Sequence, residues 1–290
     1  MSASDPSPTG LTAPGRPLAP FRFPAFRAIW TANLASNIGS MIQSVGAAWL
    51  MTDLTRSHQL VALVQASTTI PVMVLGLFAG AIADNHDRRI VMLVAQTGML
   101  IASALLAALT WAGTIGPYGL LAFTLAVGSG TALNGPAWQA SVRLQVGHED
   151  LPQAISINTI AFNLARSVGP ALGGLLISLT GPGPAFALNA LSYLALIVVL
   201  LRWHPEQPPR VRRPMLTAIA TGLKFCAGSS PVRRVLVRGF GFGFAAVGYL
   251  ALTPLLVRQQ IGGSEVDFGL LLGAFGLGSI LTALWVAPLR

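Results

Sequence analysis

Long apolar runs separated by short polar links make up most of this chain. The runs predict eight helical spans, at 28–51, 60–83, 90–111, 118–141, 154–179, 185–201, 235–257 and 266–288. Each approaches or exceeds the length of about 18 residues that an α-helix needs to cross a bilayer. The runs are continuous rather than alternating, which argues against the strands of a membrane barrel. The pattern predicts an all-α polytopic membrane protein.

Composition and charge agree with this class. Only 9% of the residues are charged, whereas soluble domains carry about 25%, and the mean hydropathy is +0.67. The net charge of +9 could suggest a nucleic-acid partner. With the N-terminus inside, however, fifteen of the eighteen Lys and Arg residues fall on one side, and only Arg56 and Arg258 fall on the other. This asymmetry follows the positive-inside rule. It predicts a cytoplasmic N-terminus, a lipid-bilayer environment and no nucleic-acid partner.

Residues that could support catalysis or bind metal are scattered. The one cysteine, Cys226, cannot form an internal disulfide, and the four histidines each lie alone near a span end. The sequence therefore predicts no metal site and no cofactor. The one cluster that could serve an enzyme is Asp84, His86 and Asp87, in a loop without a partner group elsewhere. We expect no enzymatic activity.

Proline and arginine content divides the chain into four parts. Residues 1–20 are rich in Pro, Ser and Ala and predict a disordered tail. Residues 21–203 contain six spans, residues 204–234 form a basic linker with a short helical piece at 215–227, and residues 235–290 contain two more spans. A six-span unit followed by a second unit is a familiar transporter layout. Because the second unit stops after two spans, we expect either a fragment or a truncated product.

Polar residues recur on one face of the first span. They fall at i, i+4, i+7 and i+11, with two flanking residues, and are Asn33, Asn37, Ser40, Ser44, Ser36 and Gln43. Such a stripe must face other helices or a cavity, because lipid offers polar groups no partner. Hydrogen bonding between helices is one interpretation. Two Asn and one Gln on the same face favour a wet cavity.

The fourth span has a similar face, with Thr131, Asn134 and Trp138 as its candidate cavity residues. Its Gly and Thr residues are also compatible with a close-packing seam. The third and sixth spans are plainer, with Gln96 in one and Asn189 and Tyr193 in the other. We expect these two spans to lie outside and face lipid.

The fifth span carries an arginine within the membrane. Asn163, Arg166 and Pro170 share one face, and Pro170 deprives the Arg166 carbonyl of its helical partner. A buried arginine costs at least about 2.5 kcal/mol, so Arg166 needs a carbonyl, water or anionic partner. The sequence leaves two roles open for Arg166, contact with the substrate and bracing between helices. Gly169, Pro170, Gly173 and Gly174 form a small-residue motif that predicts close helix packing.

Several motifs resemble a known family. They are G-A-I-A-D-N-H-D-R-R at 80–89, the first-span start at 30–46, N-G-P-A-W-Q-A at 134–140 and N-L-A-R-S-V-G-P-A-L-G-G at 163–174. From Phe21 to the end the chain resembles the major facilitator superfamily, and within it the enterobactin-exporter-like branch of drug and siderophore efflux proteins. The resemblance implies export of a small molecule across a bacterial inner membrane by alternating access. It also implies proton coupling and a monomeric full-length protein.

The resemblance also assigns the loop at 80–89. Gly80, Asp84, Asp87, Arg88 and Arg89 match positions that form a conformational latch between the two lobes in the family. Asn85 stands where a basic residue is common, and no predicted span carries Asp or Glu at its middle. In a chain with two spans of the second unit, Asp84 is expected to be intact but idle. The alternative interpretation is a non-transporting lobe or partner subunit.

Overall fold

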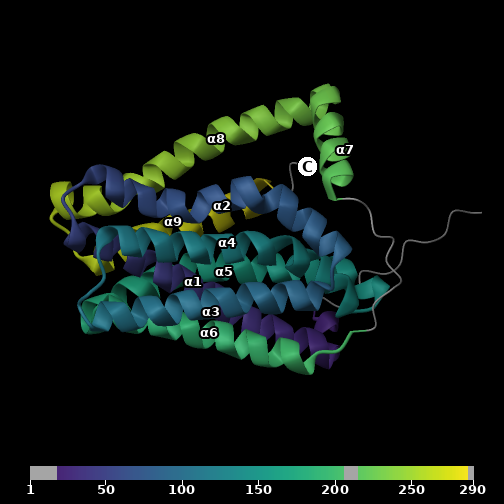
Figure 1. The fold of residues 1–290 in the computed structure, drawn as a ribbon, viewed down its shortest axis with the longest axis horizontal. Coiled ribbons are helices and arrows are strands. Elements are labelled where there is room, and N and C mark those ends of the chain that lie inside the picture. Colours follow the sequence, from purple (N-terminus) through teal and green to yellow (C-terminus); the bar gives the residue numbers. More distant parts are fainter. Residues whose placement is uncertain (1–17, 206–214, 287–290) are drawn as a thin grey trace, which may run out of the picture.

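The computed structural model describes residues 18–205 and 215–286, and every regular element in these ranges is a helix (Figure 1). The α-helices are α1 (Pro24–Leu54), α2 (His58–Asn85), α3 (Arg88–Trp111), α4 (Pro117–Ser141), α5 (Leu151–Thr180), α6 (Pro182–Arg202), α7 (Met215–Gly228), α8 (Ser230–Leu255) and α9 (Glu265–Val286). Shorter elements are the 3-10 helices η1 (Ala19–Arg22), η2 (Val142–Leu144) and η3 (His148–Asp150), and the π-helical η4 (Leu256–Ile261). Each predicted span coincides with one helix, and α7 covers the helical piece of the linker. Most of the predicted tail and the centre of the linker lie outside the described residues.

Local sequence explains where the helices begin. Proline occupies the first turn of α1, α4, α5, α6 and α8, where its missing N–H costs nothing. Asp87 caps α3, because its Oδ1 accepts hydrogen bonds from the amides of Arg89 (2.8 Å) and Ile90 (3.4 Å). Gly181 ends α5 at φ = 77°, a conformation that glycine adopts without a Cβ penalty. Because the α5–α6 link is a single residue, the two helices run antiparallel.

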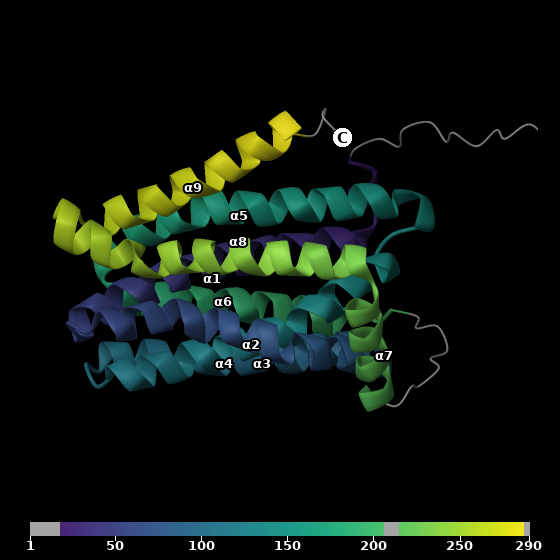
Figure 2. The ribbon, with the colours of Figure 1, turned by 90° about the horizontal axis from the view of Figure 1, so that it is seen from above.

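The first six helices pack as an incomplete ring. Neighbours in contact follow the order α2, α4, α3, α6, α1, α5, so α2 and α5 form the two flanks. The second unit continues from these flanks, since α8 packs on α2 and α9 packs on α5. Figure 2 shows α9 beside α5 and α8 crossing in front of the bundle. The packing therefore leaves a central space between the flanks, facing α1 and α4.

The outer surface is apolar, as a bilayer requires. Large apolar side chains are exposed along the helices, among them Met73 and Leu77 on α2, Ile101 on α3 and Leu191 on α6. Among the described residues, five segments are long and apolar enough to cross a membrane: α2, α3, α5 with η3, α6, and α8 with η4. The polar stripe of α1 and the Gly- and Thr-rich face of α4 lower the hydropathy of those two helices. The fold is an all-α polytopic membrane bundle.

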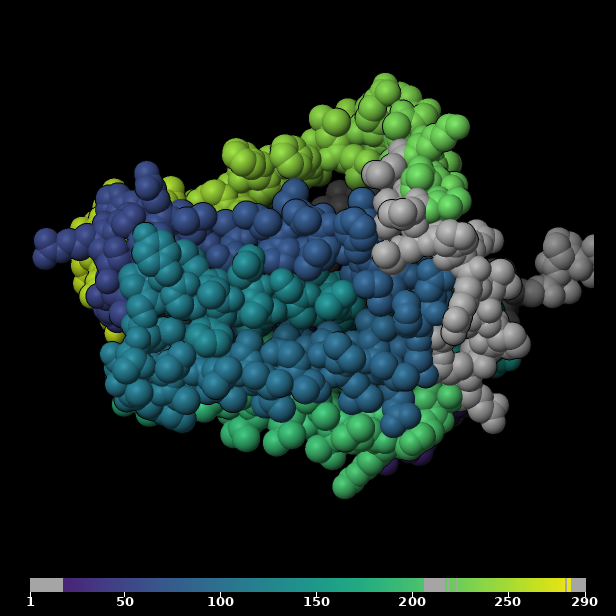
Figure 3. All heavy atoms as spheres, viewed as in Figure 1, coloured from purple at the N-terminus to yellow at the C-terminus, as the bar shows by residue number. Residues whose placement is uncertain are grey.

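The two ends of the bundle differ. One end, called the basic end here, carries both ends of the linker together with α7 and most of the arginines (Figures 1 and 2). The opposite end carries the α1–α2 and α8–α9 connections (Figure 1). Toward the basic end, α8 separates from α2 and the surface between them is hollowed (Figure 3), while α9 separates from α5 (Figure 2). The second unit thus contacts the first at the opposite end and, through α9, as far as the middle of α5.

Candidate functional site

A cavity of about 360 Å³ lies in the central space. Helices α1, α2, α4, α5, α8 and α9 line it, and α6 adds Asn189. Its polar lining residues are Ser40, Gln43, Ser44, Gln65, Thr68, Thr124, Thr131, Arg166 and Asn189. The remainder is apolar and includes Phe162, Phe268 and Phe275. This volume and this mixture are typical of a site for a small organic molecule.

The polar stripe of α1 supplies one wall. Ser40, Gln43 and Ser44 reach the cavity because residues three and four apart share a helical face. The Ser44 hydroxyl donates to the Met41 carbonyl at 2.7 Å, so the hydroxyl proton of Ser44 already has an acceptor within the helix. The Ser40 hydroxyl lies 3.1 Å from the hydroxyl of Tyr193 on α6. Hydroxyl oxygens on this wall are thus available to a ligand.

Gln43 connects the cavity wall to a buried polar network. Its Oε1 accepts hydrogen bonds from Ser103 Oγ on α3 and from Asn189 Nδ2 on α6, both at 2.8 Å. Asn189 Nδ2 also donates to the Tyr193 hydroxyl at 3.1 Å. Gln43 and Asn189 are buried, so the network replaces water for groups that would otherwise be unpaired. These bonds hold α1 in register with α3 and α6.

The network corrects the expectation that the third and sixth spans simply face lipid. Their outer faces are apolar, as expected, but Gln96, Asn189 and Tyr193 are all at most 2% exposed. Asn189 and Tyr193 point toward α1. Asn189 and Tyr193 are thus structural partners of the first span, and Asn189 also reaches the cavity.

Arg166 supplies the charge of the site. It is half-buried on α5, and its guanidinium carbon lies 5.4 Å from the centre of the Phe275 ring on α9, within the range of a cation–π contact. Among the described lining residues, Arg166 alone carries a formal charge. The contact with Phe275 leaves guanidinium donors that can bind an acceptor in the cavity.

The structure brings together five of the ten predicted cavity residues, namely Ser40, Gln43, Ser44, Thr131 and Arg166. The other five do not line this cavity, and they are Asn33, Asn37, Asn134, Trp138 and Asn163. Trp138 packs against an apolar cluster between α1, α3, α4 and α6. Asn134 Oδ1 is buried without a hydrogen-bond partner among the described residues. The predicted faces therefore extend past the cavity along each helix.

Many of the lining residues were not predicted, and four of them are instructive. Gln65 and Thr68 come from α2, and the available signal was Gln65, the one glutamine of the apolar run at 60–83. Phe162 and Phe275 come from α5 and α9, and no pattern separates them from lipid-facing phenylalanines. Within the described residues, no group of His, Cys, Asp or Glu is suited to hold a metal ion.

The loop at 80–89 ties helix ends together at the basic end. Arg88 Nη1 donates to the Ala140 carbonyl near the end of α4 (3.1 Å). Arg89 donates from Nε to the Leu200 carbonyl and from Nη2 to the Leu201 carbonyl, both at 2.7 Å, at the end of α6. Cations are favourable at helix C-termini, where carbonyls lack partners. Asp84 is exposed at the end of α2.

The glycines of α5 lie against two helices. An added methyl would lie 2.5 Å from Met41 at Gly169 and 3.1 Å from the Ile42 Cα at Gly173, both on α1. Gly174 faces α9, where its added methyl would meet the Glu265 carbonyl. The sequence prediction missed the matching set on α9, at Gly269, Gly273 and Gly276, which lies against α5 backbone. The cavity wall between α5 and α9 is thus a close backbone seam.

Comparison with known proteins fits this geometry. The family model described as "Transmembrane secretion effector", of the major facilitator superfamily, matches residues 15–290. The chain belongs to this family. Its fold is similar to that of a solved bacterial homologue of the human lysosomal transporter Spinster, with a TM-score of 0.67 and 15% identity over 94% of this chain and 64% of that one.

Curated relatives have transporter names. The chain is 22% identical to the staphyloferrin A transporter of Staphylococcus aureus, over 85% of this chain and 63% of the relative. It is 27% identical to the enterobactin exporter EntS of Shigella boydii, over 90% and 62%. It is 25% identical to macrolide efflux protein A of Streptococcus pyogenes, over 87% and 66%. The chain therefore spans somewhat less than two thirds of the length of these relatives.

Proposed function

We propose that this chain forms the substrate-binding part of a secondary active transporter that exports a small amphipathic molecule, of drug or siderophore type, by alternating access. The observation that carries the proposal is the central cavity, in which Arg166 stands among hydroxyls, amides and phenylalanines. Relatives named for siderophores and for macrolides support the export of such molecules.

The orientation follows from charge. The basic end would face the cytoplasm of a bacterial inner membrane, with the N-terminus inside and the opposite end outside. Opening of the second unit at the basic end then corresponds to access from the cytoplasm. The protein would work as a monomer, because the cavity lies within one chain.

Proton antiport is the coupling that the family resemblance implies. No Asp or Glu occurs among the described cavity-lining residues. The proposal therefore places the proton-binding group elsewhere in the protein. The loop at 80–89 is part of the same proposal as a conformational latch, with Asp84 exposed and available to a partner.

Export can be measured in cells lacking their own efflux systems and expressing the complete product of the gene. Radiolabelled macrolide, staphyloferrin A and enterobactin would be tested as substrates. For an anionic substrate held by Arg166, Arg166→Gln should weaken binding by about tenfold or more, because hydrogen bonds to charged groups contribute about 1.5–3 kcal/mol. Arg166→Lys should retain part of the affinity.

Arg143→Gln is the matched control, because Arg143 is exposed in η2 and does not line the cavity. Export of all substrates at the rate of empty cells would contradict the transporter assignment and favour the non-transporting lobe. Equal effects of the Arg166 and Arg143 variants would contradict the site assignment.

A further inference from the structure

The second unit is seated on the first unit at the end opposite the basic end. On α8 the buried residues are Ala251, Thr253, Pro254 and Leu255, all in its last turns. On α9, Phe268 is buried near the beginning of the helix. Toward the basic end, the residues of α8 are largely exposed. The α5–α9 seam continues toward the middle of the bundle, whereas α8 contacts the first unit only through these last turns.

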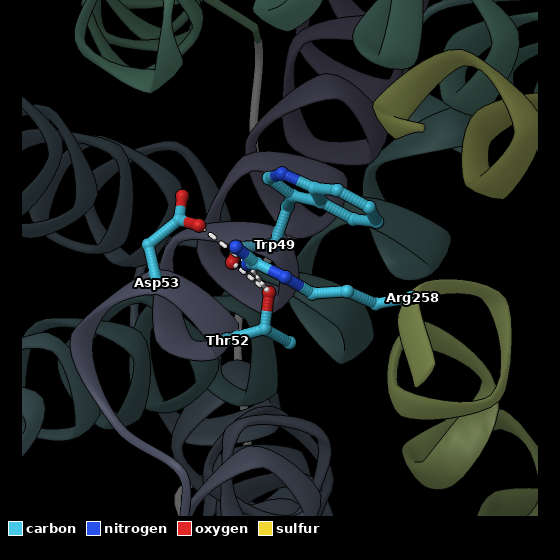
Figure 4. Close-up of polar contacts among 4 residues, drawn as sticks. All are labelled: Trp49, Thr52, Asp53 and Arg258. Atoms are coloured by element: carbon cyan, nitrogen blue, oxygen red, sulfur yellow. Dashed lines mark hydrogen bonds and ion pairs between the residues drawn. The ribbon is translucent and has the colours of Figure 1, made fainter. Parts of the chain in front are cut away.

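One polar contact dominates there. Arg258 Nη1 donates to Thr52 Oγ1 at 2.5 Å and to Asp53 Oδ1, both from the last turn of α1 (Figure 4). The guanidinium carbon also lies 5.4 Å from the centre of the Trp49 ring. Figure 4 shows Arg258 reaching across from the second unit to these three α1 side chains. We name Trp49, Thr52, Asp53 and Arg258 the clasp.

The backbone around Arg258 departs from a regular helix. Arg258 lies in the π-helical turn η4, which follows Pro254 and ends at Gly262 with φ = 67°. Single π-helical turns occur frequently at functional sites, and they change the direction of the side chains within a helix. The Gly263 amide donates to the Val257 carbonyl at 2.9 Å, which closes the turn. This irregular turn positions Arg258 against α1.

The clasp separates two spaces. On its inner side is the central cavity, whose lining includes Ala48 and Pro254. On its outer side is a second hollow of about 720 Å³, lined by Thr52, Asp53, Leu255 and Arg258 among others. Thr52 is one helical turn beyond Ala48, and Leu255 directly follows Pro254. The Trp49 ring stacks on Phe268 of α9 at 6.2 Å and adds an aromatic layer beside the clasp.

The strength of the clasp suits a contact that must open in each cycle. The Arg258 and Asp53 side chains are 39% and 44% exposed, and exposed pairs are weak because water solvates the separated charges. A fully buried pair would resist separation, since each charge would lose its partner in a low dielectric. Exposure therefore makes the clasp easy to break.

We propose that the clasp is the outer gate of the transport pathway, and that its opening connects the central cavity to the outer hollow for release of the substrate. The inference rests on the proposed function for alternating access and for the outward direction. Asp53 and Arg258 act as gating residues and make no contact with the substrate in the closed state.

The test uses cysteine chemistry. In the complete gene product, Cys226 and every other native cysteine are replaced by alanine, and Ala48→Cys places one thiol on the inner side of the clasp. A membrane-impermeant maleimide is applied to intact cells. In this background Asp53→Asn and Arg258→Gln should each raise the labelling rate by about twofold to fivefold, the population shift expected for loss of an exposed ion pair. The charge swap Asp53→Arg with Arg258→Asp should return the rate toward that of the parent.

Arg56→Gln is the matched control, because it removes one positive charge from the lining of the same outer hollow without altering the clasp. It should leave labelling unchanged. Unchanged labelling in Asp53→Asn and Arg258→Gln would overturn the gate, and so would an equal rise in Arg56→Gln. A swap variant that labels as fast as the single variants would also overturn the pairing. Labelling requires no substrate, so a gate response without export would overturn only the transport proposal.

Discussion

The backbone seam between α5 and α9 allows a sharp test of how the second unit is seated. A methyl added at Gly276 would lie 2.8 Å from the Arg166 carbonyl oxygen and 2.8 Å from the Ser167 Cα. Both neighbours are backbone atoms of α5, which cannot rotate away as a side chain can. Gly278, two residues later on the same helix, has no atom within 4 Å of an added methyl. Gly276→Ala and Gly278→Ala therefore form a matched pair.

The two substitutions are expected to change the free energy of unfolding in opposite directions. Optimal carbon contacts are about 3.5–4.0 Å, so the methyl at Gly276 requires a shift of α9 by roughly 0.7–1.2 Å. Such overpacking costs about 1–3 kcal/mol. Replacing glycine by alanine in a helix favours folding by up to about 1 kcal/mol, which offsets part of the cost at Gly276 and is the full effect at Gly278. We expect Gly276→Ala to be less stable than Gly278→Ala by about 1–3 kcal/mol.

Thermal unfolding of the two detergent-purified variants measures this difference. With about 2–4 °C per kcal/mol for domains of this general size, the Tm of Gly276→Ala should be roughly 2–12 °C below that of Gly278→Ala. Equal Tm values, or a higher Tm for Gly276→Ala, would refute the close approach of α9 to α5. The fold of the first unit would then remain, but the wall of the cavity beside Arg166 would need another arrangement.

Two further predictions concern the first unit. Gln43→Leu should lower stability by about 1–3 kcal/mol, because the buried hydroxyl of Ser103 and the amide of Asn189 each lose an acceptor, whereas Gln65→Leu on the cavity wall should have a smaller effect. The measurement is Tm in detergent, and equal losses would contradict the network. In the loop at 80–89, Arg89→Ala should lower Tm, since two carbonyls of α6 lose their donor. In the complete gene product, Asp84→Asn should keep Tm and reduce export, and normal export in that variant would contradict the latch.

The sequence predicted the helices well because the bilayer fixes their length. An apolar run of about 20 residues between polar links has one common structure in lipid. Helical periodicity also predicted which face of α1 is polar. Periodicity could not predict where along the helix axis that polar face meets the cavity. Asn33 and Ser44 are eleven residues apart, or about 16 Å along the axis, which is longer than the side of a small cavity. Ser44 reaches the cavity, and Asn33 does not.

The sequence did not predict the contacts between the two units. Asp53 and Arg258 are separated by 205 positions, and each appeared only as a charge at a span end. Their pairing depends on how α8 packs against α2 and on the π-helical turn that carries Arg258. The glycine pattern of α9 was visible, but its partner on α5 followed only from the three-dimensional packing. A single sequence provides no signal for such long-range pairs.

The seam and the clasp have different physical characters, and the alternating access proposed above would use both. At the seam, glycines place backbone against backbone, with few side chains to interlock. Such a surface can tilt without repacking, which suits a pivot between rocking units. At the clasp, closure depends on one arginine and three α1 side chains that water can replace. A pivot that resisted tilting would block opening however weak the clasp was. Gly276→Ala combined with Arg258→Gln separates the two roles: with an overpacked pivot, maleimide labelling should rise less than in Arg258→Gln alone, and Tm should fall as in Gly276→Ala alone.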